Sequence, residues 1–350
     1  MKKSHSQSRR ALCAVACGVA LAFSSLCMPL HCQTPPGGET ETPADKSPEQ
    51  TGKIVPGDSA VEIEVKGLKR HYTVHVPTGY DGKTALPVVI MFHGGGGTAA
   101  GAMKETGWAE KADKEKFLAV FPEGSRPDPT TPANFRQNPQ TWNDGSDRAI
   151  VGAAGREADD VAFVNALIDD LAARFNVDKD RIYATGFSNG ASMTFRVGRE
   201  IAYRIAAIAP AAGSDWLEKP EAGRAVSLLY ITGMEDPLNP IDGGEIKLGS
   251  RSAGKKPPVR EFIMRWVKML KLPEEPRSVC DKDGVKGVAY SRSDDDDGGG
   301  AEVVFYTVEG MGHTWAGGKS LLPESIVGKT SDKVKATDLI WGFFKKHPRK

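Results

Sequence analysis

Cysteine is scarce in the body of this chain. Four of the five cysteines lie within the first 32 residues, and Cys280 is the fifth. If the leading segment is removed, no intramolecular disulfide can form. A chain of 350 residues buries enough apolar surface to fold without one. A disulfide framework is therefore excluded.

An excess of charge of either sign is also missing. Lys and Arg total 46 and Asp and Glu total 45, which gives a formal net charge of +1. Four of the basic residues and no acid lie in the first 32 positions, so the remainder has 42 basic against 45 acidic residues, a net charge of −3. Nothing in this balance predicts nucleic acid or an anionic membrane as a partner.

The start of the chain is basic and then apolar. Four Lys and Arg residues precede an apolar stretch over residues 11–30, which Gly, Ser and Pro interrupt. This layout predicts a signal peptide over residues 1–32, cut near Cys32, with a membrane or lipid anchor as the alternative. Residues 33–58 are rich in Pro, Gly, Glu, Thr and Ser and predict a flexible linker. We expect residues 59–350 to form a secreted or periplasmic domain without a transmembrane span.

Residues 59–350 alternate strand patterns with helix patterns. Alternating polar and apolar residues in 60–65 and 70–76 predict an antiparallel hairpin with His71 and His75 on its solvent face. A helix that begins at Asp159 and Asp160, both of which are expected to cap it, precedes one buried strand. Further buried strands are predicted at 86–92, 117–122, 206–209, 227–231 and 303–308, and a helix at the end of the chain. The pattern predicts one α/β domain, a doubly wound and mostly parallel sheet with an N-terminal antiparallel hairpin.

The sequence Gly186-Phe187-Ser188-Asn189-Gly190 stands between a predicted strand and a predicted helix. A strand-to-helix turn of this kind presents a serine hydroxyl above the sheet and requires residues without side chains two positions away on either side. Ser188 is therefore the candidate nucleophile. The amide of Asn189, at the start of the helix, is a candidate oxyanion donor.

A run of four glycines, Gly94 to Gly97, follows His93 after an early buried strand. It is either a flexible surface loop or the second half of an oxyanion hole, in which the amides of Gly94 and Gly95 turn inward. Its position between that strand and the serine turn favours the oxyanion hole. We expect His93 to shape the loop without transferring a proton.

A serine nucleophile needs a base and an acid that orients the base. Only His313 and His347 follow Ser188, and His313 lies in a glycine-flanked loop after the last predicted strand. An acid at the end of a buried strand is expected between them. Asp236, beside a proline, is favoured, and Glu235 remains an alternative.

The walls of the substrate pocket are the least defined part of the prediction. Trp142 lies in a long loop over 123–157 and either lines the pocket or anchors the loop, and Trp315 is a second candidate for the wall. The acidic run 294–297 is interpreted as a surface insertion and not as a calcium site. No metal or cofactor is expected.

With these residues in place, the chain resembles the secreted polyhydroxybutyrate depolymerase, feruloyl esterase and acetylxylan esterase group of α/β-hydrolase serine esterases. The resemblance spans about Val61 to Pro348. It rests on five motifs: 93–97, 142–144, 159–161, 180–193 and 312–315. It implies a single-domain α/β-hydrolase fold with Ser188, Asp236 and His313 as catalytic triad.

The resulting hypothesis is a secreted serine carboxylesterase that forms an acyl-enzyme. Its expected substrate is a polyester oligomer or an acylated plant polysaccharide fragment. The alternatives are an acyltransferase that uses the same triad, a peptidase, and a binding module that has lost catalysis. The sequence leaves acyl and alcohol specificity and oligomeric state open.

Overall fold

A ten-stranded sheet forms the centre of the fold in the computed structural model. The structure describes residues 55–148, 151–152, 157–217, 224, 226–248, 251–292 and 300–349, which all belong to the unit Pro48–Lys350. The predicted signal peptide, most of the predicted linker and the 294–297 run lie outside the described residues. The strand order along the sheet is β1 (Gly57–Val65), β2 (Leu68–Val76), β4 (Leu118–Pro122), β3 (Leu86–Phe92), β5 (Val177–Phe187), β6 (Ala207–Ala211), β7 (Ser227–Gly233), β12 (Val303–Val308), β11 (Val285–Tyr290) and β10 (Arg277–Lys282).

The middle of the sheet is parallel and its two ends are antiparallel. Parallel pairing runs from β4 through β3, β5, β6 and β7 to β12. The β1–β2 hairpin and the β10–β11 hairpin add antiparallel strands at the two edges. The parallel strands all point in the same direction. The loops that follow their carboxyl ends therefore gather on one side of the molecule, at the carboxyl ends of the strands.

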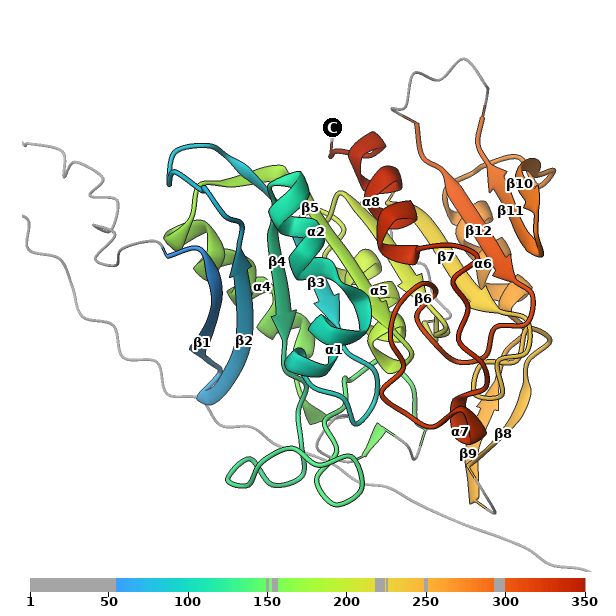
Figure 1. The fold of residues 1–350 in the computed structure, drawn as a ribbon, viewed down its shortest axis with the longest axis horizontal. Helices are drawn as coiled ribbons and strands as arrows, with labels where there is room; N and C mark the ends of the chain where they lie inside the picture. The colour runs from blue at the N-terminus through green and yellow to red at the C-terminus, as the bar shows by residue number, and fades with distance from the viewer. Residues whose placement is uncertain are drawn as a thin grey trace, which may run out of the picture. The chain divides into compact units, whose positions relative to one another are not determined.

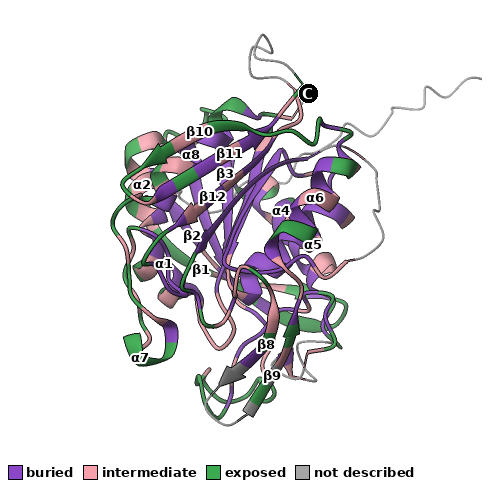
Figure 2. Cartoon of the chain, turned by 90° about the vertical axis from the view of Figure 1, so that its right-hand side faces the viewer, coloured by how far each residue is buried: buried purple, intermediate pink, exposed green. Residues whose placement is uncertain are grey.

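Helices cover both faces of the sheet (Figures 1 and 2). On one face lie α1 (Ala99–Thr106), α2 (Trp108–Glu115) and α8 (Ala336–Lys346), and on the other lie α4 (Asp160–Arg174), α5 (Asn189–Glu200) and α6 (Val259–Met269). A short helix, α7 (Glu324–Val327), and a separate two-stranded sheet of β8 (Gly244–Leu248) and β9 (Arg251–Lys256) lie at the end of the molecule where the loops gather.

The strand sequences explain the two hydrophobic cores. In β3, alternate side chains point to opposite faces of the sheet. Val88, Ile90 and Phe92 enter the cluster beneath α4, α5 and α6, while Val89 and Met91 enter the cluster beneath α1, α2 and α8. Both sets are fully buried, which is why the run is apolar without alternation.

Two local predictions for the N-terminal half are wrong. His75 is buried and not on the solvent face, because its ring nitrogens lie 2.6 Å and 3.4 Å from carboxylate oxygens of Asp58 and Asp113. Asp160 does not cap α4. It is fully buried, accepts a hydrogen bond from Arg70 at 2.6 Å and accepts another from the amide of Asn143 at 2.7 Å.

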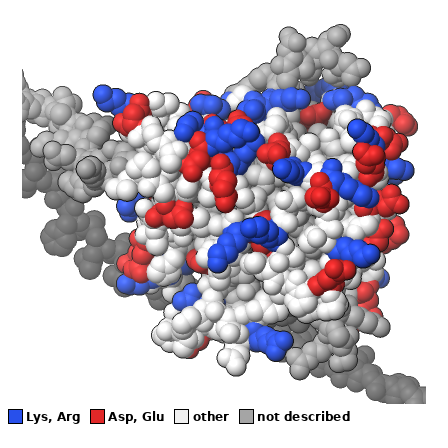
Figure 3. Space-filling view, viewed as in Figure 1, with Lys and Arg blue, Asp and Glu red and all other residues white. Residues whose placement is uncertain are grey.

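The surface over α1, α2 and α8 mixes the two signs of charge. Lys and Arg side chains there are interspersed with Asp and Glu (Figure 3). In the part of the chain that the structure describes, no helix is both long enough and apolar enough to cross a bilayer.

Candidate active site

Ser188 occupies the turn that joins β5 to α5. Its φ of 56° and ψ of −117° place a residue with a side chain in a strained region of backbone space. The turn is tight enough that a Cβ on Gly186 would lie 2.3 Å from the carbonyl oxygen of Gly190. A Cβ on Gly190 would lie 2.2 Å from the carbonyl oxygen of Phe92, at the end of β3. The glycines therefore let the helix start pack directly on the neighbouring strand.

Gly190→Ala should lower the free energy of unfolding by about 3 kcal/mol, because the new methyl group would force β3 and α5 apart. Urea unfolding followed by circular dichroism measures this change. Gly342→Ala is the matched control, since no atom lies within 4 Å of the position of its Cβ. That second change should stabilise α8 by up to about 1 kcal/mol. Equal effects of the two substitutions would contradict the close packing of the turn.

The structure brings Ser188, His313 and Asp236 together. The Nε2 atom of His313 lies 2.8 Å from Oγ of Ser188, and its Nδ1 atom lies 2.8 Å from Oδ2 of Asp236. His313 and Asp236 are 4% and 3% exposed, so bulk water competes little for either hydrogen bond. In this arrangement Nδ1–H donates to the carboxylate and Nε2 accepts from the serine hydroxyl.

The loops after β7 and β12 bring the acid to the histidine. Gly233 ends β7, and a Cβ there would lie 2.1 Å from the carbonyl oxygen of Met311, so the two loops pack at backbone distance. The Oδ1 atom of Asp236 accepts hydrogen bonds from the amides of Leu238 at 2.8 Å and Asn239 at 2.7 Å. The backbone thus holds one carboxylate oxygen and leaves Oδ2 for the imidazole.

Glu235, the alternative acid, does not contact the imidazole of His313. Its side chain is exposed and accepts a hydrogen bond from the amide of Gly310, in the loop before His313. Of the two acids, only Asp236 contacts the imidazole in the described structure.

The predicted oxyanion donors border one cavity with Ser188. Gly94, Gly95 and Asn189 all line it. The carbonyl oxygen of Gly94 accepts from the amide of Gly97 at 2.9 Å, which closes a tight turn. Asn189 is the first residue of α5, where backbone amides have no partner within the helix.

The side chain of Asn189 has a role that the sequence did not indicate. Its Oδ1 atom accepts from the amide of Trp142 at 2.8 Å, and its Nδ2 atom donates to Oδ2 of Asp144 at 2.8 Å. The residue that follows the candidate nucleophile therefore ties α5 to the 142–144 loop. The motif Trp142-Asn143-Asp144, which lies far from Asn189 in the sequence, is the feature that could have suggested this contact.

His93 is a buried structural histidine. Its Nδ1 atom lies 2.8 Å from the carbonyl oxygen of Gly94, and its Nε2 atom accepts from the amide of Gly124 at 3.0 Å. Burial lowers the pKa of the ring, although the negative charge of Glu123 opposes this shift. The neutral ring joins the glycine loop to the segment after β4, in agreement with a loop-shaping role.

The prediction that Trp142 and Trp315 line the pocket is wrong. Trp142 is fully buried, donates from Nε1 to the carbonyl oxygen of His93 at 2.9 Å and packs edge-on against Phe92. It is an anchor for its loop, which is the other role considered for it. Trp315 is 3% exposed and donates to the hydroxyl of Thr337 at 3.0 Å, at the start of α8.

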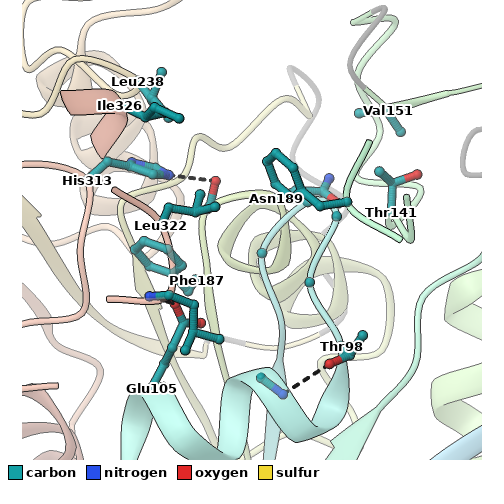
Figure 4. Close-up of a pocket in the computed structure, with 18 of the residues that line it drawn as sticks. Thr98, Glu105, Thr141, Val151, Phe187, Asn189, Leu238, His313, Leu322 and Ile326 are labelled. Carbon is teal, nitrogen blue, oxygen red and sulfur yellow. Dashed lines mark hydrogen bonds between the residues drawn. The ribbon is translucent and has the colours of Figure 1, made fainter. Parts of the chain in front are cut away.

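The cavity beside Ser188 has a volume of about 340 Å³, which suits a small acyl or aryl group. Figure 4 shows Phe187, Leu238, Leu322 and Ile326 around His313, with Thr141 and Val151 across the cavity. The large apolar residues of the lining are Phe135, Phe187, Leu238, Ile246, Leu321, Leu322 and Ile326. None of them was predicted, because they come from segments far apart in the sequence.

Three charged side chains also line this cavity, and the sequence indicated none of them. They are Glu105 on α1, Arg148 and Lys256. Burial raises the pKa of Glu105 to about 7. In the described part of the chain, no group of three or more His, Cys, Asp or Glu side chains is arranged to hold a metal ion.

Comparison with known proteins gives one family. Residues 70–255 match the family described as esterase PHB depolymerase. A protein of Nocardia uniformis subsp. tsuyamanensis named "Putative esterase NocK" is 28% identical over 301 residues, which are 80% of this chain and 80% of that protein. Feruloyl esterase B of Piromyces equi is 28% identical over 257 residues, which are 71% of this chain but only 44% of that protein.

Solved structures give the same fold. An acetyl xylan esterase from Aspergillus awamori superposes with a TM-score of 0.52 at 13% identity and covers 82% of this chain and 99% of its own. An S-formylglutathione hydrolase from Agrobacterium tumefaciens gives 0.51 at 13% identity, covering 84% and 98%. At such low identity these likenesses establish an α/β-hydrolase fold and nothing further.

Proposed function

Because the chain belongs to the PHB depolymerase esterase family, it is an enzyme that hydrolyses carboxylic esters, and we propose that it does so as a serine esterase with Ser188 as nucleophile. The observation that carries the proposal is the unbroken chain of two 2.8 Å hydrogen bonds from Ser188 through His313 to Asp236. A serine hydroxyl, a base and an orienting carboxylate in this order are the arrangement that activates serine in acyl transfer.

In the proposed mechanism His313 takes the proton of the Ser188 hydroxyl as Oγ attacks the ester carbonyl. Asp236 holds the Nδ1–H tautomer and stabilises the imidazolium that forms. The amides of Asn189 and of Gly94 or Gly95 receive the tetrahedral oxyanion, a role in which one donor contributes about 10²–10³ in rate.

Collapse of the tetrahedral intermediate then breaks the ester. His313 returns the proton to the leaving alcohol, and the acyl group stays on Ser188. A water molecule that is deprotonated by His313 attacks this acyl-enzyme and releases the acid.

The lining of the cavity supports an ester with a small or aromatic apolar part. Three of its side chains, Phe135, Leu321 and Ile326, are 51%, 54% and 41% exposed, so an apolar rim leads inward to Ser188. Apolar side chains at such a rim remove the apolar surface of an incoming ester from water. Feruloyl and hydroxybutyrate esters, which the names of the relatives suggest, both fit this description.

A panel of esters tests the proposal and identifies the substrate class. The purified protein is expected to hydrolyse at least one of 4-nitrophenyl acetate, 4-nitrophenyl butyrate, methyl ferulate, acetylated xylan and hydroxybutyrate oligomers, with Ser188→Ala as the blank. Failure on all of them by a folded protein would contradict the proposal. Transfer of the acyl group to an added alcohol, at the expense of hydrolysis, would identify an acyltransferase instead.

Export of the enzyme is also part of the proposal. The basic and then apolar start of the chain supports cleavage near Cys32. N-terminal sequencing of the protein recovered outside the cytoplasm checks this, and an intact Met1 would contradict it.

A further inference from the structure

A buried lysine forms part of the wall of the ester cavity. Lys256 is the last residue of β9 and is 6% exposed, yet it lines the same cavity as Ser188 and His313. It comes from the small β8–β9 sheet, which lies beyond the edge of the main sheet (Figure 2). The residue is thus shielded from bulk water and borders the space that an ester would occupy.

The ammonium group of Lys256 has spare hydrogen-bonding capacity. Its Nζ atom donates to Oδ1 of Asn239 at 2.8 Å. An ammonium group has three N–H donors. Within the described residues Nζ forms no ion pair with a carboxylate and no other hydrogen bond. A buried ammonium group without a counter-ion is costly, and a carboxylate beside it would offset this cost.

The nearby acids cannot supply that charge. Asp236 is bound to His313 and to two backbone amides, and Asp144 is paired with Arg148 at 2.6 Å. Both acids attract the ammonium only from a distance, while Arg148 repels it. Burial, followed by the charge of Arg148, lowers the pKa of Lys256 to about 7. An anion that entered the cavity would keep the lysine charged and complete the site.

Among the described residues, Lys256 is the one basic residue of the lining without a carboxylate partner. Arg148 also lines the cavity and is held in place by Asp144 and by the face of the Trp216 ring, 4.4 Å from its guanidinium carbon. Glu105, the acidic residue of the lining, belongs to α1, and Figure 4 shows it below Phe187, on the α1 side of the cavity.

We propose that the cavity binds esters that carry a free carboxylate, and that the ammonium group of Lys256 receives that carboxylate. Half-esters of dicarboxylic acids and hydroxy-acid oligomers that end in a carboxylate have this chemistry. The inference rests on the proposed function, because the carboxylate is selected only when the ester carbonyl lies at Ser188.

Matched pairs of esters test the inference on the wild-type enzyme. Mono-4-nitrophenyl adipate and 4-nitrophenyl hexanoate have acyl chains of equal length that end in a carboxylate and a methyl group. For the alcohol side, 4-acetoxybenzoate is compared with 4-acetoxybenzamide. In at least one pair kcat/KM should favour the carboxylate by about 10-fold or more, as a charge-assisted hydrogen bond in a buried site provides. Ratios of one or less in both pairs would overturn the inference.

Substitution of Lys256 tests whether the preference for carboxylate esters depends on this residue. In Lys256→Met the preference should fall by about 10- to 100-fold. Lys256→Gln, which keeps a donor for Asn239, should show the same fall and serves if the methionine variant does not fold. For each variant, kcat/KM for the carboxylate ester is divided by kcat/KM for the neutral ester. A loss of activity that is common to both esters therefore cancels.

Lys255→Met is the control for the lysine variants, since it removes the same charge from an exposed side chain one position earlier in β9. It should leave the preference unchanged. A preference that survives in folded Lys256 variants, or that falls equally in Lys255→Met, would overturn the inference. Failure of the wild type to hydrolyse the neutral esters would instead contradict the proposed function itself.

Discussion

Ser188→Ala should lower kcat/KM for every ester that the enzyme hydrolyses by about 10⁴–10⁶-fold, because it removes the hydroxyl that is proposed to accept the acyl group. The fold should survive. Alanine at this position can adopt the same backbone conformation. The substitution removes only the hydrogen bond between the serine hydroxyl and His313. Steady-state hydrolysis and thermal unfolding measure the two effects separately.

Ser192→Ala is the matched control for this substitution. Ser192 lies one turn further along α5 and is buried, whereas Ser188 is partly exposed. The hydroxyl of Ser192 accepts from the amide of Ser214 at 3.1 Å and from the indole of Trp216 at 3.2 Å. Its loss should cost about 1–2 kcal/mol of stability and leave kcat/KM within about 3-fold. Residual activity of Ser188→Ala above a tenth of the wild type would show that another nucleophile acts.

The parts of the fold that could be predicted from sequence are those with local causes. Apolar runs such as 86–92 are buried on both faces of a sheet, and that requirement acts at every residue of the run. The turn at Ser188 could be predicted because its glycines are required by contacts within a few residues and with the adjacent strand.

The β10–β11 hairpin has a local sequence signal in its turn. β10 and β11 are joined at Asp283 and Gly284, with φ values of 54° and 77°. Positive φ at both central residues is the geometry that favours Asp-Gly in a two-residue hairpin turn. The polar sequence of β10, an edge strand, concealed the strand pattern on one side of this turn.

The cavity could not be predicted for a different reason. Leu238 lies in the loop after β7, Lys256 on β9 of the small sheet and Ile326 on α7 after β12. These residues meet only after the fold has formed. The same applies to His75, which would face water if Asp58 and Asp113 did not flank it. Burial of such residues depends on tertiary partners and leaves no periodic pattern.

The sequence favoured Asp236 over Glu235 only through its neighbouring proline, because the two acids are adjacent in one loop. The structure gives the choice a sharp test. In Asp236→Asn the amide oxygen should take the place of Oδ1, which accepts from the amides of Leu238 and Asn239. The NH₂ group would then face Nδ1 of His313 and make that atom an acceptor. The proton of the neutral ring would move to Nε2, where the ring could no longer accept the proton of Ser188.

Asp236→Asn should therefore lower kcat by about 10⁴-fold, with little change in KM, because the substituted atom does not line the cavity. Glu235→Gln is the matched control. Its exposed side chain keeps an oxygen for the amide of Gly310, and kcat should stay within about 3-fold of the wild type. The reverse result, a large loss in Glu235→Gln and a small one in Asp236→Asn, would place the acid at Glu235. Equal losses would mean that the loop as a whole, and not one carboxylate, positions His313. A loss confined to Asp236→Asn, in a protein that still unfolds cooperatively, follows only if Oδ2 of this carboxylate sets the tautomer of the base.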